Sequence, residues 1–85
     1  MNELQMLTQE EVAELLHANI MTISMLREIE VIRATKTGRN YMFAQDEIRR
    51  FQRDYSGLDV SNRVHALRSK EIVENKNKLT ERSFR

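Results

Sequence analysis

The side chains of this sequence best suited to chemistry are basic and hydrogen-bonding residues gathered around one glycine. Lys36 and Arg39 lie on either side of Gly38, and Asn40 and Tyr41 follow directly. Lysine and arginine at a hairpin tip suit phosphate groups by charge, and arginine in a narrow minor groove of DNA also senses the shape of that groove. The alternative interpretation is the solvated tip of a hairpin.

A second group of candidates is apolar. If a helix follows Asn19 with Ile23 and Leu26 pointing inward, 100° per residue places Met21, Met25 and Ile29 in a stripe on its outer face. Three interpretations stay open. The stripe could belong to the core if the helix is rotated or the tail folds over it, it could contact thymine methyl groups, or it could bind a protein, to which flexible methionine is suited.

Catalysis has little support in the sequence. His17 and His65 are far apart, and His17 is well placed as a cation at the end of a helix. The pairs Glu10-Glu11 and Asp46-Glu47 fit the acidic first turns of helices better than an acid and base pair. No phosphate-binding glycine loop or metal-ligand spacing occurs, so we expect no enzyme, no cofactor and no metal site.

Composition and charge agree with a single small domain. The 85 residues include no cysteine, no proline and two glycines, which favours helices over a disulfide framework. Residues 1–18 carry a net charge of −4, residues 19–57 of +2 and residues 58–85 of +3, which sum to the net +1. Such an asymmetry could orient the protein on an anionic surface, or it is ordinary surface charge. No apolar run is long enough to span a membrane and no signal-peptide pattern begins the chain, so we expect a cytoplasmic protein.

Two helices are predicted in the first third of the chain. Thr8 and Glu11 form a capping box, so a helix should begin at Gln9 and run to about His17, burying Val12, Leu15 and Leu16. Asn19 is the next cap, and it should start a helix that turns Ile20, Ile23 and Leu26 toward the core. Because only Ala18 separates His17 from Asn19, the two helices must cross steeply, as in a helix-turn-helix.

A hairpin and a third helix should follow. We predict strands at about 31–35 and 40–43, joined by a turn in which Gly38 takes a positive φ. A helix over about 45–55 should then bury Ile48, Phe51 and Tyr55 and end at Ser56-Gly57.

Residues 58–85 differ in character. Val60, Val64 and Leu67 could form one face of a helix that starts near Asp59 or Ser61. The apolar residues beyond Leu67 keep no regular period, so we expect a basic C-terminal helix or tail, with most of residues 70–85 mobile in the absence of a partner.

Five motifs along residues 7–51 follow one known pattern without a gap. They are Leu7-Thr8, Glu11-Val12-Ala13-Glu14-Leu15-Leu16, Thr22-Ile23 with Leu26, Gly38-Arg39-Asn40-Tyr41, and Glu47-Ile48 with Phe51. On these motifs residues 7–51 resemble the excisionase-family, MerR-like winged helix-turn-helix DNA-binding domain. The expected fold is therefore mostly α with a small β-hairpin, as a winged helix-turn-helix over residues 7–55 and a C-terminal helix or tail over residues 58–85.

The resemblance implies that the protein binds double-stranded DNA. The second helix would enter the major groove, where Thr22 would touch DNA, while Arg39 would supply the contact of the wing and Tyr41 would approach a phosphate. Position and chemistry add other residues to the expected interface: Asn19, Met21, Met25, Lys36 and Asn40. The chain departs from the family at Met21 and Met25, because the family usually has polar or basic residues on the exposed part of this helix.

Two roles fall within the resemblance. One is an excisionase of a prophage or mobile element, a recombination directionality factor that bends DNA, binds adjacent repeats beside copies of itself and contacts an integrase. The other is a transcriptional regulator associated with the nucleoid. The alternative from a different class is a protein-interaction module that uses the apolar face of the second helix.

Overall fold

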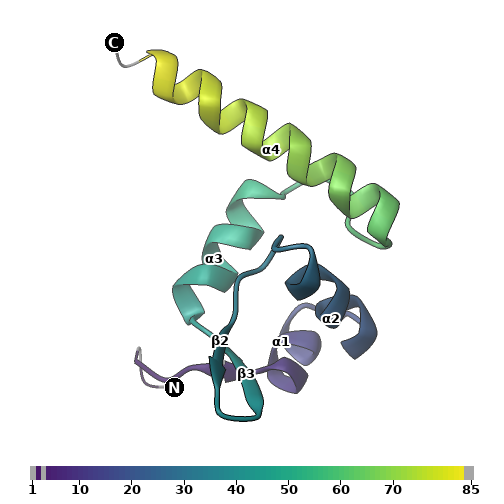
Figure 1. Ribbon diagram of the computed structural model, residues 1–85, viewed down its shortest axis with the longest axis vertical. Coiled ribbons are helices and arrows are strands. Elements are labelled where there is room, and N and C mark those ends of the chain that lie inside the picture. Colours follow the sequence, from purple (N-terminus) through teal and green to yellow (C-terminus); the bar gives the residue numbers. More distant parts are fainter. Residues whose placement is uncertain (1, 3, 84–85) are drawn as a thin grey trace.

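The computed structural model describes residue 2 and residues 4–83. Within them the chain forms an α+β fold of four helices and one antiparallel three-stranded sheet (Figure 1). The elements are, in order, β1 (Leu7–Thr8), α1 (Gln9–Leu15), α2 (Ile20–Glu28), β2 (Thr35–Thr37), β3 (Asn40–Phe43), α3 (Gln45–Asp54) and α4 (Arg63–Ser83). The strand order is β1-β3-β2, and the β2–β3 hairpin lies at the opposite end of the molecule from α4.

The start of α1 is held as the sequence predicts. The Glu11 N–H donates to the Thr8 hydroxyl at 3.1 Å, and the Thr8 N–H donates to the Glu11 carboxylate at 2.9 Å. Both halves of the capping box are therefore present. Leu7 pairs with Phe43 of β3, so β1 begins the sheet where the sequence indicated only the residue before a cap.

The turn between α1 and α2 uses a residue with left-handed backbone. The helix ends at Leu15 rather than near His17, because His17 adopts a φ of 53°. The His17 N–H donates to the Glu14 carbonyl and the Ala18 N–H donates to the Ala13 carbonyl, at 3.2 and 2.9 Å. These two bonds close the helix as a Schellman motif.

Helix α2 begins as predicted and buries part of the predicted face. Asn19 caps it by accepting from the Met21 N–H at 2.8 Å. Ile23 and Leu26 are fully buried, but Ile20 is 39% exposed and the prediction for that residue was wrong. The same holds in α1, where Leu15 is 54% exposed and the buried residues are Val12 and Ala13.

The predicted strand at 31–35 is mostly not a strand. Glu30 has a φ of 60°, and the Val31 N–H turns back to the Leu26 carbonyl at 2.9 Å. Val31 and Ile32 therefore enter the core as an irregular segment, and pairing begins only at Thr35. Their β-branched apolar character reflected burial rather than strand pairing.

The hairpin itself is confirmed. Thr37 pairs with Asn40, which leaves Gly38 and Arg39 as a two-residue loop. Gly38 has a φ of 74°, the positive value that such a loop requires at its first position.

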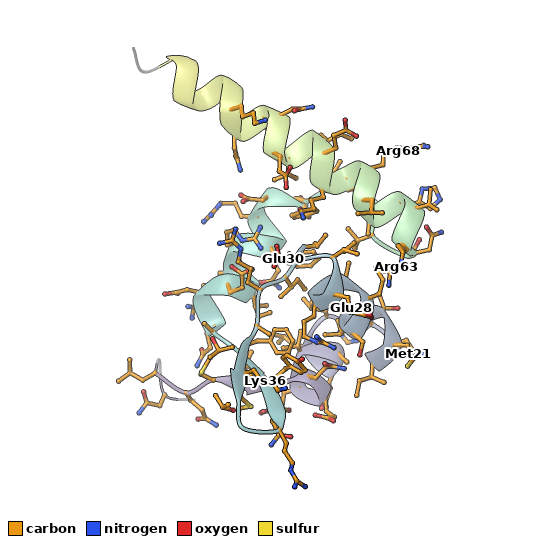
Figure 2. The ribbon with its side chains drawn as sticks, in the orientation of Figure 1. Met21, Glu28, Glu30, Lys36, Arg63 and Arg68 are labelled. Atoms are coloured by element: carbon orange, nitrogen blue, oxygen red, sulfur yellow. The ribbon has the colours of Figure 1, made fainter. Side chains whose placement is uncertain are left out.

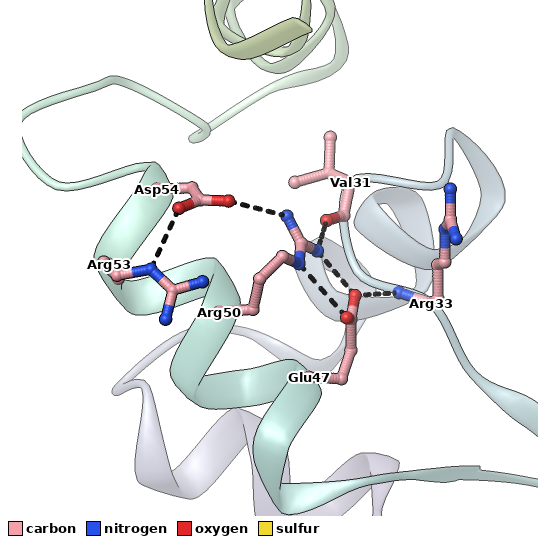
Figure 3. Close-up of polar contacts among 6 residues, drawn as sticks. All are labelled: Val31, Arg33, Glu47, Arg50, Arg53 and Asp54. Atoms are coloured by element: carbon pink, nitrogen blue, oxygen red, sulfur yellow. Dashed lines mark hydrogen bonds and ion pairs between the residues drawn. The ribbon is translucent and has the colours of Figure 1, made fainter. Parts of the chain in front are cut away.

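Helix α3 is confirmed, and it ends one residue before the predicted end. Polar side chains of this helix hydrogen-bond to the irregular segment at Val31 and Arg33 (Figure 3). Arg50 Nη2 donates to the Val31 carbonyl at 2.7 Å and pairs with Glu47 Oε2 at 2.5 Å. The Arg33 N–H donates to the same carboxylate at 2.8 Å. Burial by itself raises the pKa of Glu47, but the hydrogen bonds from Arg50 and Arg33 and their positive charges outweigh it, so the pKa of this carboxyl is lowered.

Helix α4 joins the core through a face that the sequence did not indicate. Over residues 63–78 of this helix, the buried residues are Ala66, Ser69 and Val73, and the Ser69 hydroxyl donates to the Asp59 carbonyl at 2.7 Å. Of the suggested face of Val60, Val64 and Leu67, Val60 lies before the helix and packs against the core, whereas Val64 and Leu67 are 66% and 46% exposed.

The core thus extends beyond residue 55. The helix continues to Ser83, while residues 84 and 85 of the predicted tail lie outside the described part of the chain. The predicted mobility of residues 70–85 stays a prediction. Among the described residues, no helix is long and apolar enough to cross a membrane.

Candidate nucleic-acid interface

The outward side of α2 presents few side chains to solvent. Met21 is 72% exposed and projects from the body of the molecule (Figure 2). Thr22 beside it is partly exposed, and Asn19 is exposed while its side chain caps the helix. These three residues, all expected at the interface, therefore lie together at the N-terminal end of α2.

The apolar stripe does not continue along the helix as predicted. Met25 and Ile29 are partly buried and pack against the core. Helix α4 lies against this end of α2, where Lys70 Nζ donates to the Ile29 carbonyl at 2.9 Å. The stripe on the outer face is thus reduced to Met21, and Met25 lies mainly in a packing position.

The hairpin presents the expected polar groups. Lys36, Arg39 and Asn40 are all exposed, and open space surrounds Gly38. Among the described residues, neither Lys36 nor Arg39 has a carboxylate within ion-pair distance. The charges of the hairpin are therefore available to an outside anion.

Tyr41 joins the hairpin to α2. The Arg27 guanidinium stacks on its ring, 3.8 Å from the centroid, and Lys36 Nζ lies 5.9 Å from the same centroid. Lys36 is also the cross-strand partner of Tyr41. This cation–π contact brings a third cation to the boundary between α2 and the hairpin. Arg27 was not among the interface residues expected from the sequence, although it is the only basic residue of α2.

Helix α1 holds α2 in place from the other side. Gln9 Nε2 donates to the Ser24 hydroxyl at 2.5 Å. Ser24 is thus occupied by a contact within the protein, and Met21 and Thr22 remain on the free side of the helix.

One acidic group on α2 is paired with α4. Glu28, exposed near the end of α2, lies 3.8 Å from Arg63 Nη2. Figure 2 shows Arg63 beside Glu28 at the start of α4. Without a partner, a glutamate at this position would repel phosphate groups. The pairing with Arg63 depends on how α4 packs, so no local pattern could have revealed it.

No group of acidic, histidine or cysteine side chains in the described part of the chain could hold a metal ion. The candidate site described above is a surface that presents positive charge and hydrogen-bonding groups. A scan against protein-family models, a search of curated proteins and a search of solved structures each found no match to this chain.

Proposed function

We propose that this protein binds double-stranded DNA, with α2 in the major groove and the β2–β3 hairpin as a wing on the adjacent backbone. The observation that carries the proposal is the set of three cations at the boundary of these elements. Arg27, Lys36 and Arg39 have no carboxylate within ion-pair distance among the described residues, although the chain holds nearly as many acidic as basic side chains. Lysine and arginine side chains without a carboxylate partner are suited to binding phosphate groups.

The order of the elements supports the same proposal. Helices α1 and α2 are joined by a turn of four residues, and the hairpin and α3 follow. This order is that of a winged helix-turn-helix, in which the second helix reads bases and the hairpin contacts the backbone.

Met21 and Thr22 are the proposed reading residues. Met21 can contact a thymine methyl group, and the Thr22 hydroxyl can hydrogen-bond to a base or phosphate. Since α2 exposes little else that could read bases, we propose that sequence preference is modest and that most affinity comes from phosphate contacts.

The biological role that fits such a protein is an excisionase or a transcriptional regulator of a prophage or mobile element. Either role would operate on DNA in the cytoplasm, and an excisionase would also contact an integrase or further copies of itself. The alternative, a protein-binding module built on Met21, Met25 and Ile29, has less exposed apolar surface to rest on because Met25 and Ile29 pack inward.

A salt series tests the proposal. Fluorescence anisotropy of a labelled duplex of mixed sequence should report binding whose logarithm of affinity falls linearly with the logarithm of salt concentration between about 50 and 200 mM. A polyanion of another chemistry, such as heparin, serves as the comparison, and absence of binding to duplex at low salt would overturn the proposal.

A further inference from the structure

A hollow lies between the end of α2 and the start of the hairpin. Its volume is about 300 Å³, and it is lined by Arg27, Glu30, Arg33, Ala34 and Tyr41. It therefore opens where a DNA strand would pass between the reading helix and the wing under the proposed function.

The Arg27 guanidinium has a hydrogen-bond donor that the described residues do not satisfy. Its Nε is buried and has no hydrogen-bond partner among the described residues. A buried donor without a partner is costly, so the position of the Arg27 guanidinium needs an explanation. The ring of Tyr41, 3.8 Å from the guanidinium carbon, fixes the plane of the group. The guanidinium is thus held in a fixed orientation, and its Nε donates no hydrogen bond within the described residues.

The charges around the hollow favour an anion. Arg27, Arg33 and Lys36 lie on or next to it, and within the described residues none of them has a carboxylate within ion-pair distance. Glu30 also lines the hollow and opposes an anion, and Arg33 shares its charge with Glu47 on α3. The lining itself holds two cations, Arg27 and Arg33, against the one carboxylate of Glu30, so its formal charge is positive.

We propose that this hollow is a seat for one phosphodiester group of duplex DNA, with Arg27 as its principal donor and Arg33 as its second cation. This site rests on the proposed function, to which it adds a contact between Arg27 and one phosphate of the DNA backbone. A planar guanidinium presents parallel N–H groups that match two oxygens of a phosphate, whereas a lysine can offer only a point charge. Tyr41 acts as a positioning residue, because its ring orients Arg27.

Variants of Arg27 test the seat through DNA affinity and its salt dependence. Arg27→Gln should weaken binding to duplex and lower the magnitude of the log–log salt slope by roughly 0.9, the value for one lost phosphate contact. Arg27→Lys should keep the salt slope but recover only part of the affinity. Arg53→Gln, which removes an exposed arginine of α3 next to Asp54, is the matched control and should change neither quantity appreciably.

Removal of the Glu30 carboxylate should change the affinity for duplex in the opposite direction. Glu30→Gln removes the negative charge beside the seat, so it should tighten binding to duplex and leave the salt slope close to that of the parent. Weaker binding by this variant, with the fold retained, would contradict the proposal.

A measurement on the unmodified protein avoids any question of folding. The ¹H–¹⁵N signal of Arg27 Nε should shift on addition of duplex DNA. Inorganic phosphate at the same phosphate concentration should have a much smaller effect. If inorganic phosphate shifts the signal and duplex does not, the ligand is a free anion and the proposal is overturned.

Two further results separate this proposal from the proposed function. If the hairpin variant Lys36→Ala with Arg39→Ala loses affinity while Arg27→Gln binds as the parent does, the protein binds DNA but the phosphate seat is wrong. If the parent protein does not bind duplex at all, both proposals fail.

Discussion

Lys70 Nζ donates to the Ile29 carbonyl at 2.9 Å, so a side chain of α4 completes the C-terminal end of α2. The carbonyl groups at a helix end have no partner in the helix and carry the negative end of its dipole, which a cation stabilises. Since Lys70 is mostly buried, this charged hydrogen bond attaches α4 to the proposed reading helix in addition to packing. Within α4, Lys70 also lies 3.8 Å from Glu74.

Lys70→Ala should therefore lower the free energy of unfolding by about 1–2 kcal/mol, the range for a hydrogen bond from a charged donor with partial solvent screening. Urea unfolding followed by circular dichroism measures the change. Lys78→Ala, at an exposed position of the same helix, is the control and should have little effect. Equal effects of the two variants would mean that the contact with Ile29 contributes nothing measurable.

Met21 and Met25 should respond differently to substitution by alanine. Met25→Ala removes a partly buried side chain and should cost about 1–2 kcal/mol of stability, less than the value of about 2–5 kcal/mol for a fully buried site. Met21→Ala should leave the melting temperature almost unchanged, because that side chain is 72% exposed.

The DNA affinities should follow the opposite order. Met21→Ala should weaken binding to a duplex selected from a random pool by up to about tenfold, equal to about 1.4 kcal/mol, and should spare binding to unrelated duplex. Thermal melts beside titrations of both duplexes distinguish the outcomes. Loss of a protein partner with DNA affinity retained would favour the protein-interaction module instead.

The wing should contribute affinity that depends on salt. Lys36→Ala with Arg39→Ala removes two exposed cations, so the log–log salt slope should fall by roughly 1.8, at about 0.9 for each phosphate contact. Arg49→Ala with Arg53→Ala removes the same charge from α3, where both arginines already lie next to aspartates. Equal losses of affinity and of salt slope in the two double variants would show that binding depends on the net charge of the protein and not on the position of the hairpin cations.

His17→Gly should stabilise the protein. His17 is exposed and has a φ of 53°, a conformation that costs a residue with Cβ roughly 1–2 kcal/mol and costs glycine little. We expect a net gain of about 0.5–1 kcal/mol in chemical denaturation, after the greater entropy of glycine in the unfolded chain is subtracted. His65→Gly, inside α4, should instead destabilise by up to about 1 kcal/mol. A loss of stability in the first variant would indicate a role for the His17 side chain.

Glu47 should make stability depend on acid pH. Its pKa is lowered in the folded state, so its contribution is fully present above the unfolded value of about 4.3 and is lost as pH falls through the folded pKa. Glu47→Gln should cost about 2 kcal/mol near pH 7, because the partly buried Arg50 keeps only the more distant carboxylate of Asp54, at 3.8 Å, and the difference from the parent should shrink below about pH 4.

Asp46→Asn is the matched control for this pH series. Asp46 forms the same type of pair with Arg49 three residues on, but its side chain is 95% exposed, and such pairs contribute little. Urea midpoints across the pH range would measure both variants. A difference for Glu47→Gln that stays constant down to pH 2 would contradict the assigned shift.

Local signals in the sequence determined the elements whose causes lie within a few residues. The capping box of Thr8 and Glu11 starts α1, the Asn19 cap starts α2, and Gly38 allows the two-residue hairpin loop. Each depends on backbone bonds or a φ value that neighbouring residues decide, so the sequence alone predicts it. The exposed Lys36 and Arg39 follow from the same local turn.

Tertiary packing decided which faces are covered and which charges are free. Helix α4 approaches the body through Ala66 and Ser69, because small side chains let a helix come close, and this leaves the larger Val64 and Leu67 outside. The same approach pairs Glu28 with Arg63 and closes the end of α2 where Met25 packs.

The contact of Arg27 with Tyr41 joins residues 14 positions apart on different elements, as the pairing of Leu7 with Phe43 joins residues 36 positions apart. Periodicity describes one element at a time and carries no information about which element will lie against it. The sequence therefore determined where α1 and α2 start and where the hairpin turns, and only the assembled fold decided that Arg27 would be held against the hairpin with its Nε unpaired.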